Sequence, residues 1–462
     1  MYECPNCSGN LKFEIKSQKL VCAYCGGSFD PYSITKDTDA IENNFKNDDF
    51  FDVTVFTCPQ CGGELFSEDN EATSFCSFCG ASTILSSRIS REKRPDFIIP
   101  FKKTKEDCKK AYAQKMRKAF FVPKELRNPE YIDEFRGIYM PYWSYQLIQK
   151  GNVLLKGEKS YRRGDYVYTE RYDLSGRLDS YYLGYSSDAS TSFYDNISQA
   201  LAPYDAKEMV HFTPAFLSGF YADTADVGPE VYVGDAMEKA EENTFRSICK
   251  EEAFQGLKVK RPKDQRQGMG TDLRKADNTM YPVWFLTYRN KDRVAYMTVN
   301  GQTGKVVADM PIEPKRYLAA SLLLAVPIFL FLNLFLTLRP AWLLGLGAVL
   351  AAVSAVIYGL ELEGIHKREH NLDDRGFTGK KEKGKKARAG LGRGFFVTAA
   401  LSAAAVLSAA MIGIVRPVSD VYYYTGGLLA LGAVLFNMIE IIRNYNRLAM
   451  RRLPQFDKKE VA

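Results

Sequence analysis

Eight cysteines at repeated intervals are the residues of this 462-residue chain whose types and spacing could do chemistry. They form four C-x-x-C pairs, and both halves of the set repeat spacings of two, fourteen and two intervening residues. Two such pairs, brought together by a short hairpin, offer four thiolates in the tetrahedral arrangement that zinc prefers. The sequence therefore predicts two structural Zn2+ ions, with iron in the same ligands as the chemical alternative. The predicted metal ligands are Cys4, Cys7, Cys22, Cys25, Cys58, Cys61, Cys76 and Cys79.

Disulfides and redox-active pairs are the rival interpretations of these cysteines. Disulfides suit oxidising compartments, whereas these residues precede the first apolar segment and are expected to lie in the cytoplasm. A thioredoxin-like pair needs a strand-helix context, but these pairs lie among short polar and aromatic strands. Catalytic zinc needs an open coordination position, which four protein sulfurs do not leave. Because each set has its own four ligands, replacement of Cys22 or Cys76 is expected to unfold only the affected ribbon.

Four apolar runs near the C-terminus each have the length of about twenty residues that a bilayer requires. They span residues 317–338, 341–360, 395–415 and 421–442, and very short connections join the first to the second and the third to the fourth. Inside lipid only a helix satisfies all of its own backbone groups, so two transmembrane helical hairpins are predicted. The alternative is a bundle buried in a soluble protein. The first run is expected to direct the chain to the membrane, because the N-terminus is polar.

The positive charge around these runs predicts their orientation. Residues 361–394, between the two hairpins, contain ten Lys and Arg residues, whereas the two hairpin turns carry one Arg each, Arg339 and Arg416. Lys and Arg close to span ends remain on the cytoplasmic side. Both termini and the central loop are therefore expected in the cytoplasm of a multi-pass protein of the cell membrane, and the basic loop is expected to contact anionic lipid headgroups.

The charge of the N-terminal part argues against specific nucleic-acid binding. Residues 1–86 hold five basic and thirteen acidic side chains, and metal-bound thiolates would add further negative charge. Phosphate binding depends on basic surface that these ribbons lack. Residues 88–118 carry twelve Lys and Arg against four acids. This basic stretch is interpreted mainly as a solvated face, and contact with lipid or nucleic acid is the alternative.

Local patterns predict the elements of the region between the cysteines and the apolar runs. Thr104 with Asp107 forms a helix-capping signature, and Asp235 with Glu238 forms another. A polar stretch from Lys258 to Asp277 is expected to be an exposed loop. Strand-like runs are predicted at 152–155, 165–172 and 178–185, followed by a β-meander at 283–288, 294–299 and 306–308.

The order of several motifs resembles a known protein family. Ile99-Pro-Phe101 precedes a Lys-rich helix, Gly137-Ile-Tyr-Met-Pro-Tyr-Trp143 follows, and Pro282-Val-Trp284 leads to Asn300-Gly-Gln-Thr-Gly304. Together with the Cys-pair ribbons, this order is similar to bacterial TFIIB-type zinc-ribbon membrane proteins, which are often mislabelled primosomal or helicase proteins. Similar proteins occur beside flotillin-like and phage-shock-type envelope proteins. The resemblance implies a role at the envelope and supplies no catalytic residues.

The predicted fold class is multidomain: two four-Cys zinc ribbons, an α+β, antiparallel β-rich cytoplasmic domain, and a four-helix transmembrane region. Only three His and no P-loop motif are present, so neither an enzyme nor a bound organic cofactor is predicted. The expected function is a membrane-anchored scaffold for protein partners, and a membrane-tethered nucleic-acid-binding regulator is the alternative. The predicted segments are ribbon 1 (1–36), an acidic linker (37–54), ribbon 2 (55–87), the α+β domain (88–314), transmembrane hairpin 1 (315–360), a basic loop (361–394), transmembrane hairpin 2 (395–442) and a basic tail (443–462).

Overall fold

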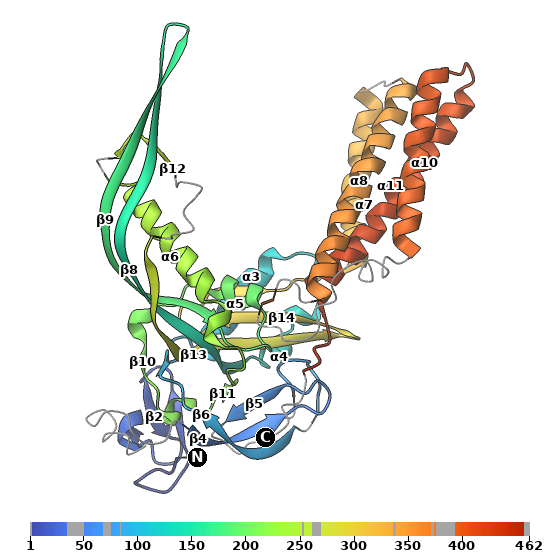
Figure 1. The fold of residues 1–462 in the computed structure, drawn as a ribbon. Helices are drawn as coiled ribbons and strands as arrows, with labels where there is room; N and C mark the ends of the chain where they lie inside the picture. The colour runs from blue at the N-terminus through green and yellow to red at the C-terminus, as the bar shows by residue number, and fades with distance from the viewer. Residues whose placement is uncertain are drawn as a thin grey trace.

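The computed structural model describes residues 2–34, 50–67, 75–83, 85–251, 254–260, 269–335, 339–370, 374–375 and 393–456. Most of the predicted acidic linker lies outside these residues. The described chain forms a small three-stranded sheet, a 13-stranded sheet and four long apolar helices. Figure 1 shows that the apolar helices and a long β-hairpin project from the same side of the β domain, while the N-terminal region lies at its base.

The first four cysteines belong to the small antiparallel sheet. It contains β1 (Leu11–Glu14), β2 (Lys19–Cys22) and β3 (Ser28–Phe29), and the short helix α1 (Pro31–Ile34) follows it. Alternation along β1 buries Leu11 and Phe13 against the domain core. The small sheet is also bonded to the larger domain, because Phe13 N donates to Ser218 O at 3.0 Å.

The last four cysteines lie between strands that are part of the large sheet. β4 (Phe50–Thr57) pairs with β5 (Glu64–Ser67) on one side and with β6 (Ser86–Lys93) on the other. β5 also pairs with β11 (Tyr221–Ala222), which is a parallel neighbour of β8 (Arg136–Arg163). The second cysteine region is therefore continuous with the central sheet. The sequence had predicted a separate small module here.

Two very long strands form the projecting hairpin. β8 pairs with β9 (Tyr166–Asp188) from Tyr142↔Asp188 to Arg163↔Tyr166 around a tight turn. The three predicted strand runs between 152 and 185 are pieces of these two strands. β12 (Lys258–Lys260) pairs with β8, and β13 (Thr271–Asn290) runs beside β8 over most of its own length. The loop expected at 258–277 is therefore wrong for residues 258–260 and 271–277, which form strands, although most of these residues are exposed as expected.

The predicted β-meander is confirmed at the end of the domain. β13, β14 (Arg293–Asn300) and β15 (Val306–Ala308) pair in antiparallel order. β7 (Phe97–Ile98) lies beside β13, and β10 (Val210–His211) lies beside β7.

The helices of the domain show one correct and one wrong prediction of a cap. α3 (Lys105–Lys118) begins after Thr104, which forms the expected capping box with Asp107. α6 (Val233–Ile248) starts before Asp235, and its N-cap residue, Tyr232, makes no side-chain cap. The Tyr232 hydroxyl instead donates to the buried carboxylate of Asp195 at 2.6 Å, so tertiary packing decides where this helix starts. The remaining short helices are α4 (Pro129–Ile132) and α5 (Asp195–Leu201), with 3-10 turns at Glu125–Arg127, Ala206–Glu208, Pro214–Leu217 and Pro229–Val231.

Four helices in the C-terminal part are long and apolar enough to cross a membrane. They are α7 (Pro314–Phe335), α8 (Pro340–Glu369), α10 (Arg393–Val415) and α11 (Asp420–Ala449). Large apolar side chains cover their outer surface, as lipid contact requires. α8, α10 and α11 pack around a small cluster of four buried alanines.

The chain returns to the β domain after the last apolar helix. β16 (Arg451–Arg452) pairs with β14, and Leu453 N donates to Asp292 O at 3.1 Å. A few residues later, Phe456 N donates to Cys61 O at 2.7 Å, and the Phe456 ring packs edge-on against Phe78. The described part of the predicted basic tail is thus bound to the domain beside the second cysteine group.

Candidate metal centres

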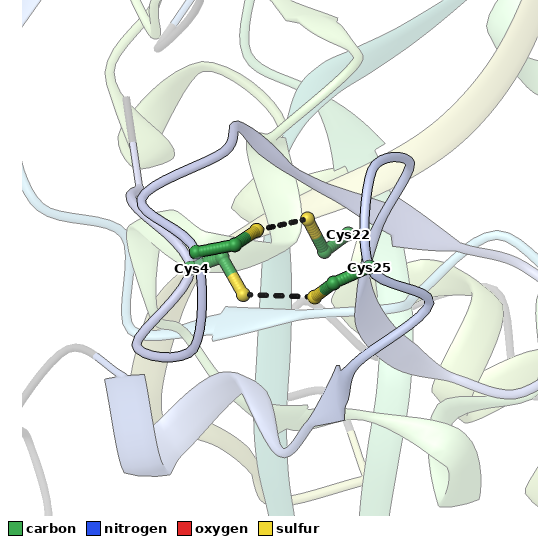
Figure 2. Close-up of side chains that lie close together, drawn as sticks. Cys4, Cys22 and Cys25 are labelled. Carbon is green, nitrogen blue, oxygen red and sulfur yellow. Dashed lines mark hydrogen bonds between the residues drawn. The ribbon is translucent and has the colours of Figure 1, made fainter.

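The structure brings the eight predicted cysteines into two groups of four. Within each group the sulfur atoms all lie within 4.8 Å of one another. Figure 2 shows Cys4, Cys22 and Cys25 on facing turns, with their side chains directed into the space between those turns. Among the described residues, these two groups are the ones in which three or more Cys, His, Asp or Glu side chains could share a metal ion.

The distances between sulfur atoms fit a tetrahedral metal. The Sγ atoms of Cys4 and Cys25, and those of Cys7 and Cys22, lie 3.5 Å apart. In the second group the corresponding distances, Cys58 to Cys79 and Cys61 to Cys76, are 3.7 Å. A zinc-sulfur bond of about 2.3 Å implies sulfur atoms about 3.8 Å apart in a regular tetrahedron. The ten cysteines are free, and a disulfide would instead join sulfur atoms about 2 Å apart.

All four cysteine pairs use the same backbone turn. The N–H of the first cysteine donates to the carbonyl five residues later, and the carbonyl of the first cysteine accepts from the N–H four residues later. The residue four positions after the first cysteine has a positive φ in every turn. Glycine adopts this conformation at little cost, and a serine occupies it in the remaining turn. These residues are Ser8 (φ 56°), Gly26 (φ 71°), Gly62 (φ 74°) and Gly80 (φ 66°).

These turns also direct N–H groups at the sulfurs. The backbone N–H groups of Cys25 and Tyr24 point at the sulfur of Cys22 and lower the pKa of its thiol to about 6. In the second group, Gly63 N donates to Cys61 Sγ at 3.5 Å. Such donors favour the thiolate form, which is the form that binds metal.

The two groups differ in their surroundings. Cys7 and Cys25 of the first group are exposed, whereas all four cysteines of the second group are buried. Phe78, 1% exposed, fills the space beside the second group and packs against Phe285 of β13. The second group therefore lies wholly within the domain core, whereas the first group packs on the core through Cys4 and Cys22 and exposes its other two ligands.

Other residues that the sequence singled out have structural contacts. Asn300 is fully buried; its side-chain oxygen accepts from the N–H groups of Gln302 and Thr303, and its Nδ2 donates to Leu201 O. The motif at 300–304 is thus the turn between β14 and β15, and Asn300 bonds it to the end of α5. The rings of His366 and His370 lie 4.3 Å apart at the end of α8, where His370 Nδ1 is bonded to His366 O.

Comparison with known proteins gives one distant relative and no family. The chain is 28% identical over 316 residues to a Bacillus subtilis (strain 168) protein described as "Uncharacterized protein YdjG", and the match covers 68% of this chain and 90% of that protein. No family model matches the chain. No solved structure matches it either.

Proposed function

We propose that this protein is a membrane-anchored zinc-ribbon scaffold that holds protein partners at the cytoplasmic face of the cell membrane. The observation that carries the proposal is the combination of two four-sulfur clusters with a β domain that is tied to four apolar helices. Zinc is the proposed metal because four thiolates in tetrahedral spacing suit it and leave no open position for catalysis. The order of motifs supports membership of the bacterial TFIIB-type zinc-ribbon membrane proteins.

Contacts between the membrane segments and the domain support the proposed topology. β16 follows the last helix and pairs with β14, so the chain on both sides of the four spans belongs to one folded domain. Between the two helical pairs, Arg375 N donates to Asp195 Oδ2 at 3.1 Å. All three segments therefore lie on one side of the proposed bilayer. The positive charge of residues 361–394 favours the cytoplasm as that side.

The projecting hairpin supplies the surface that we assign to protein partners. Near its turn, Tyr161, Tyr166 and Tyr168 are exposed, and the rings of Tyr161 and Tyr168 stack at 5.7 Å. Exposed tyrosines provide large contact areas at low conformational cost, and they are enriched in protein interfaces. β9 pairs only with β8 among the described strands, which leaves a long edge open to another strand.

Affinity capture from detergent-solubilised membranes tests this function. The bait is the full chain, and a truncated form replaces residues 159–170 with an Asn-Gly turn directly after the Glu158↔Arg171 pair. Proteins retained by the full chain and lost from the truncated form would support the scaffold. Ser160→Ala, which keeps the tyrosines, is the matched control and should retain the same proteins.

A nucleic-acid titration distinguishes the alternative function. The full chain in detergent is titrated with duplex DNA, single-stranded DNA and RNA at about 150 mM salt, where exposed charges beyond about 8 Å are largely screened. The acidic first 86 residues lead us to expect only weak binding without sequence preference. Tight, sequence-selective binding would refute the scaffold and favour a membrane-tethered regulator.

A further inference from the structure

The three packed helices carry polar residues at helical spacing on the faces that meet one another. On each helix these positions are three or four residues apart, so each set forms one stripe. The stripes occupy the half of the bundle nearest the β domain, where α8 and α11 end and α10 begins (Figure 1). Their polar members are Ser354, Tyr358 and Glu361 on α8, Thr398 and Ser402 on α10, and Asn437, Glu440 and Asn444 on α11; Gly394 precedes Thr398 by one turn.

At the end of the stripes farther from the β domain, polar side chains form a hydrogen-bonded cluster. This cluster lies next to a layer of apolar side chains. Asn437 is fully buried, and its Nδ2 donates to Ser354 Oγ at 2.8 Å and to Ser402 Oγ at 2.9 Å. Its Oδ1 and the buried hydroxyl of Thr398 make no hydrogen bond within the described chain. Beyond this cluster, the inner positions are filled by Ala351, Ala405, Ala430 and Ala433. The polar stripes therefore stop part-way along the bundle.

The end near the β domain is rich in oxygen atoms. The Asn444 side chain, 1% exposed, lies beside the Tyr358 hydroxyl and the Glu361 carboxylate. Glu440 pairs with Arg443, and its carboxylate also faces the first turn of α10. A Cβ added to Gly394 would lie 3.0 Å from both Glu440 Oε2 and the Tyr358 hydroxyl, so glycine permits this close approach.

Three buried atoms at this end lack a hydrogen bond of normal geometry within the described residues, although the Asn444 side chain lies against Tyr358 and Glu361. Neither polar atom of Asn444 makes a hydrogen bond of normal geometry in the described chain, and neither does the buried Glu361 Oε2. No Lys or Arg of the described residues forms an ion pair with Glu361, whereas Glu440 has Arg443. Interhelical hydrogen bonding accounts for the Asn437 amide nitrogen but not for these oxygens. Buried oxygens without a partner are costly, and a bound cation would compensate Asn444 Oδ1 and Glu361 Oε2.

We propose that Glu361, Asn444, Tyr358 and Glu440 form a binding site for a small alkali cation, Na+ or K+. Carboxylate, amide and hydroxyl oxygens are the ligands of hard cations. In its ionised form the Glu361 carboxylate, which pairs with no described Lys or Arg, supplies a negative charge to the cation. The buried amide of Asn444 supplies an oxygen that otherwise has no partner. Alanines fill the inside of the bundle beyond the polar stripes. The cation therefore reaches the site from the side of the β domain.

Cation binding to the purified full chain in detergent tests this site. Radiolabelled Na+ should bind saturably, and unlabelled NaCl should displace it while choline chloride at equal ionic strength should not. NaCl should also raise the unfolding temperature above that in choline chloride, because a ligand that binds only the folded state stabilises it. If KCl, and not NaCl, displaces the label and raises the unfolding temperature, the bound cation is K+, which the proposal also includes.

Variants at the site and at a neighbouring glutamate separate cation binding from general charge effects. Glu361→Gln and Asn444→Leu should each weaken Na+ affinity by at least about tenfold, as loss of a metal-site partner commonly does. Glu363→Gln is the matched control, because Glu363 lies two residues away on α8 and its exposed carboxylate pairs with Lys367. It should bind Na+ as the unaltered chain does. Absence of saturable binding of either cation to the unaltered chain, or equal losses in Glu361→Gln and Glu363→Gln, would overturn the proposal.

Discussion

Cys76→Ser should destabilise the centre of the β domain, whereas Cys22→Ser should affect mainly the N-terminal ribbon, residues 2–34. Serine replaces a thiolate ligand with a weak one, so the metal and the turns that it holds are lost. The turns of the second group are bonded to the central strands, whereas the ribbon of the first group is bonded to the domain through Ser218 and Phe101. The contacts at risk in Cys76→Ser are Tyr296 Oη to Phe78 O at 2.8 Å, Phe456 N to Cys61 O at 2.7 Å, Arg136 Nη1 to Phe75 O at 3.2 Å, and Thr287 Oγ1 to Ser77 O.

The structure gives the size of the expected loss. Each hydrogen bond contributes about 1 kcal/mol net, and burial of Phe78 contributes about 2 kcal/mol. Disruption of this contact set therefore costs about 6 kcal/mol, which is comparable with the entire stability of about 5–15 kcal/mol of an ordinary domain. Cys22→Ser leaves these contacts in place. The sequence alone predicts that either variant unfolds only its own ribbon. With the structure, we expect this result only for Cys22→Ser.

Hydrogen exchange of the full-length variants measures where protection is lost. In Cys76→Ser, protection should fall in β13 and β14 as well as in the cysteine turns, whereas in Cys22→Ser the loss should stay within residues 2–34 and the turn around Ser218. Cys249→Ser, at a half-buried cysteine outside both groups, is the control. If β13 and β14 keep their protection in a Cys76→Ser protein that has lost its metal, the second group is not part of the domain core.

Three further predictions concern metal, topology and pH. Elemental analysis should find two zinc ions per chain, unchanged in Cys108→Ser and reduced to one in Cys22→Ser; iron or a value near zero would contradict the zinc assignment. An epitope tag inserted after Val418 should be accessible from outside intact cells, whereas tags after Lys383 or at the C-terminus should not; the reverse pattern would contradict the proposed orientation. Burial raises the pKa of Asp223 to about 7, so the folded state keeps a proton that the unfolded state releases above about pH 4. Stability should therefore fall between about pH 4 and 7 and then level off; Asp223→Asn should flatten this decline, and an unchanged pH profile would refute this origin.

The local patterns of the sequence predict the cysteine turns and the apolar helices, because spacing and hydrophobic length determine both. The helix after Thr104 follows from its own capping residues in the same way. The length of β8 and β9 could not be predicted from runs of apolar residues, since much of the hairpin exposes both faces and its polar residues hide the strand pattern. The start of α6 depends on the contact of Tyr232 with Asp195, which lies far away in the sequence.

The candidate cation site shows the same division between local and tertiary information. Glu440 is recognisable in the sequence as an ionisable residue inside an apolar run. The sequence does not reveal that Glu440 lies near Glu361. The second apolar run was predicted to end at residue 360, so Glu361 was assigned to the basic loop. α8 in fact continues to Glu369, and this extension places Glu361 on the same face as Tyr358.

The return of the chain after α11 links the helical bundle to the second cysteine group. Arg451 is 6% exposed, and its guanidinium lies over the ring of Tyr194 at 3.7 Å while Arg451 Nη2 donates to Asn196 Oδ1 at 2.6 Å. Arg452 pairs with Glu369 at the end of α8, so the ends of two apolar helices meet at this point. Only a short segment separates these anchors from Phe456, whose N–H bonds to Cys61 O. The ends of α8 and α11 are therefore connected, over a few residues, to the turn that carries Cys61.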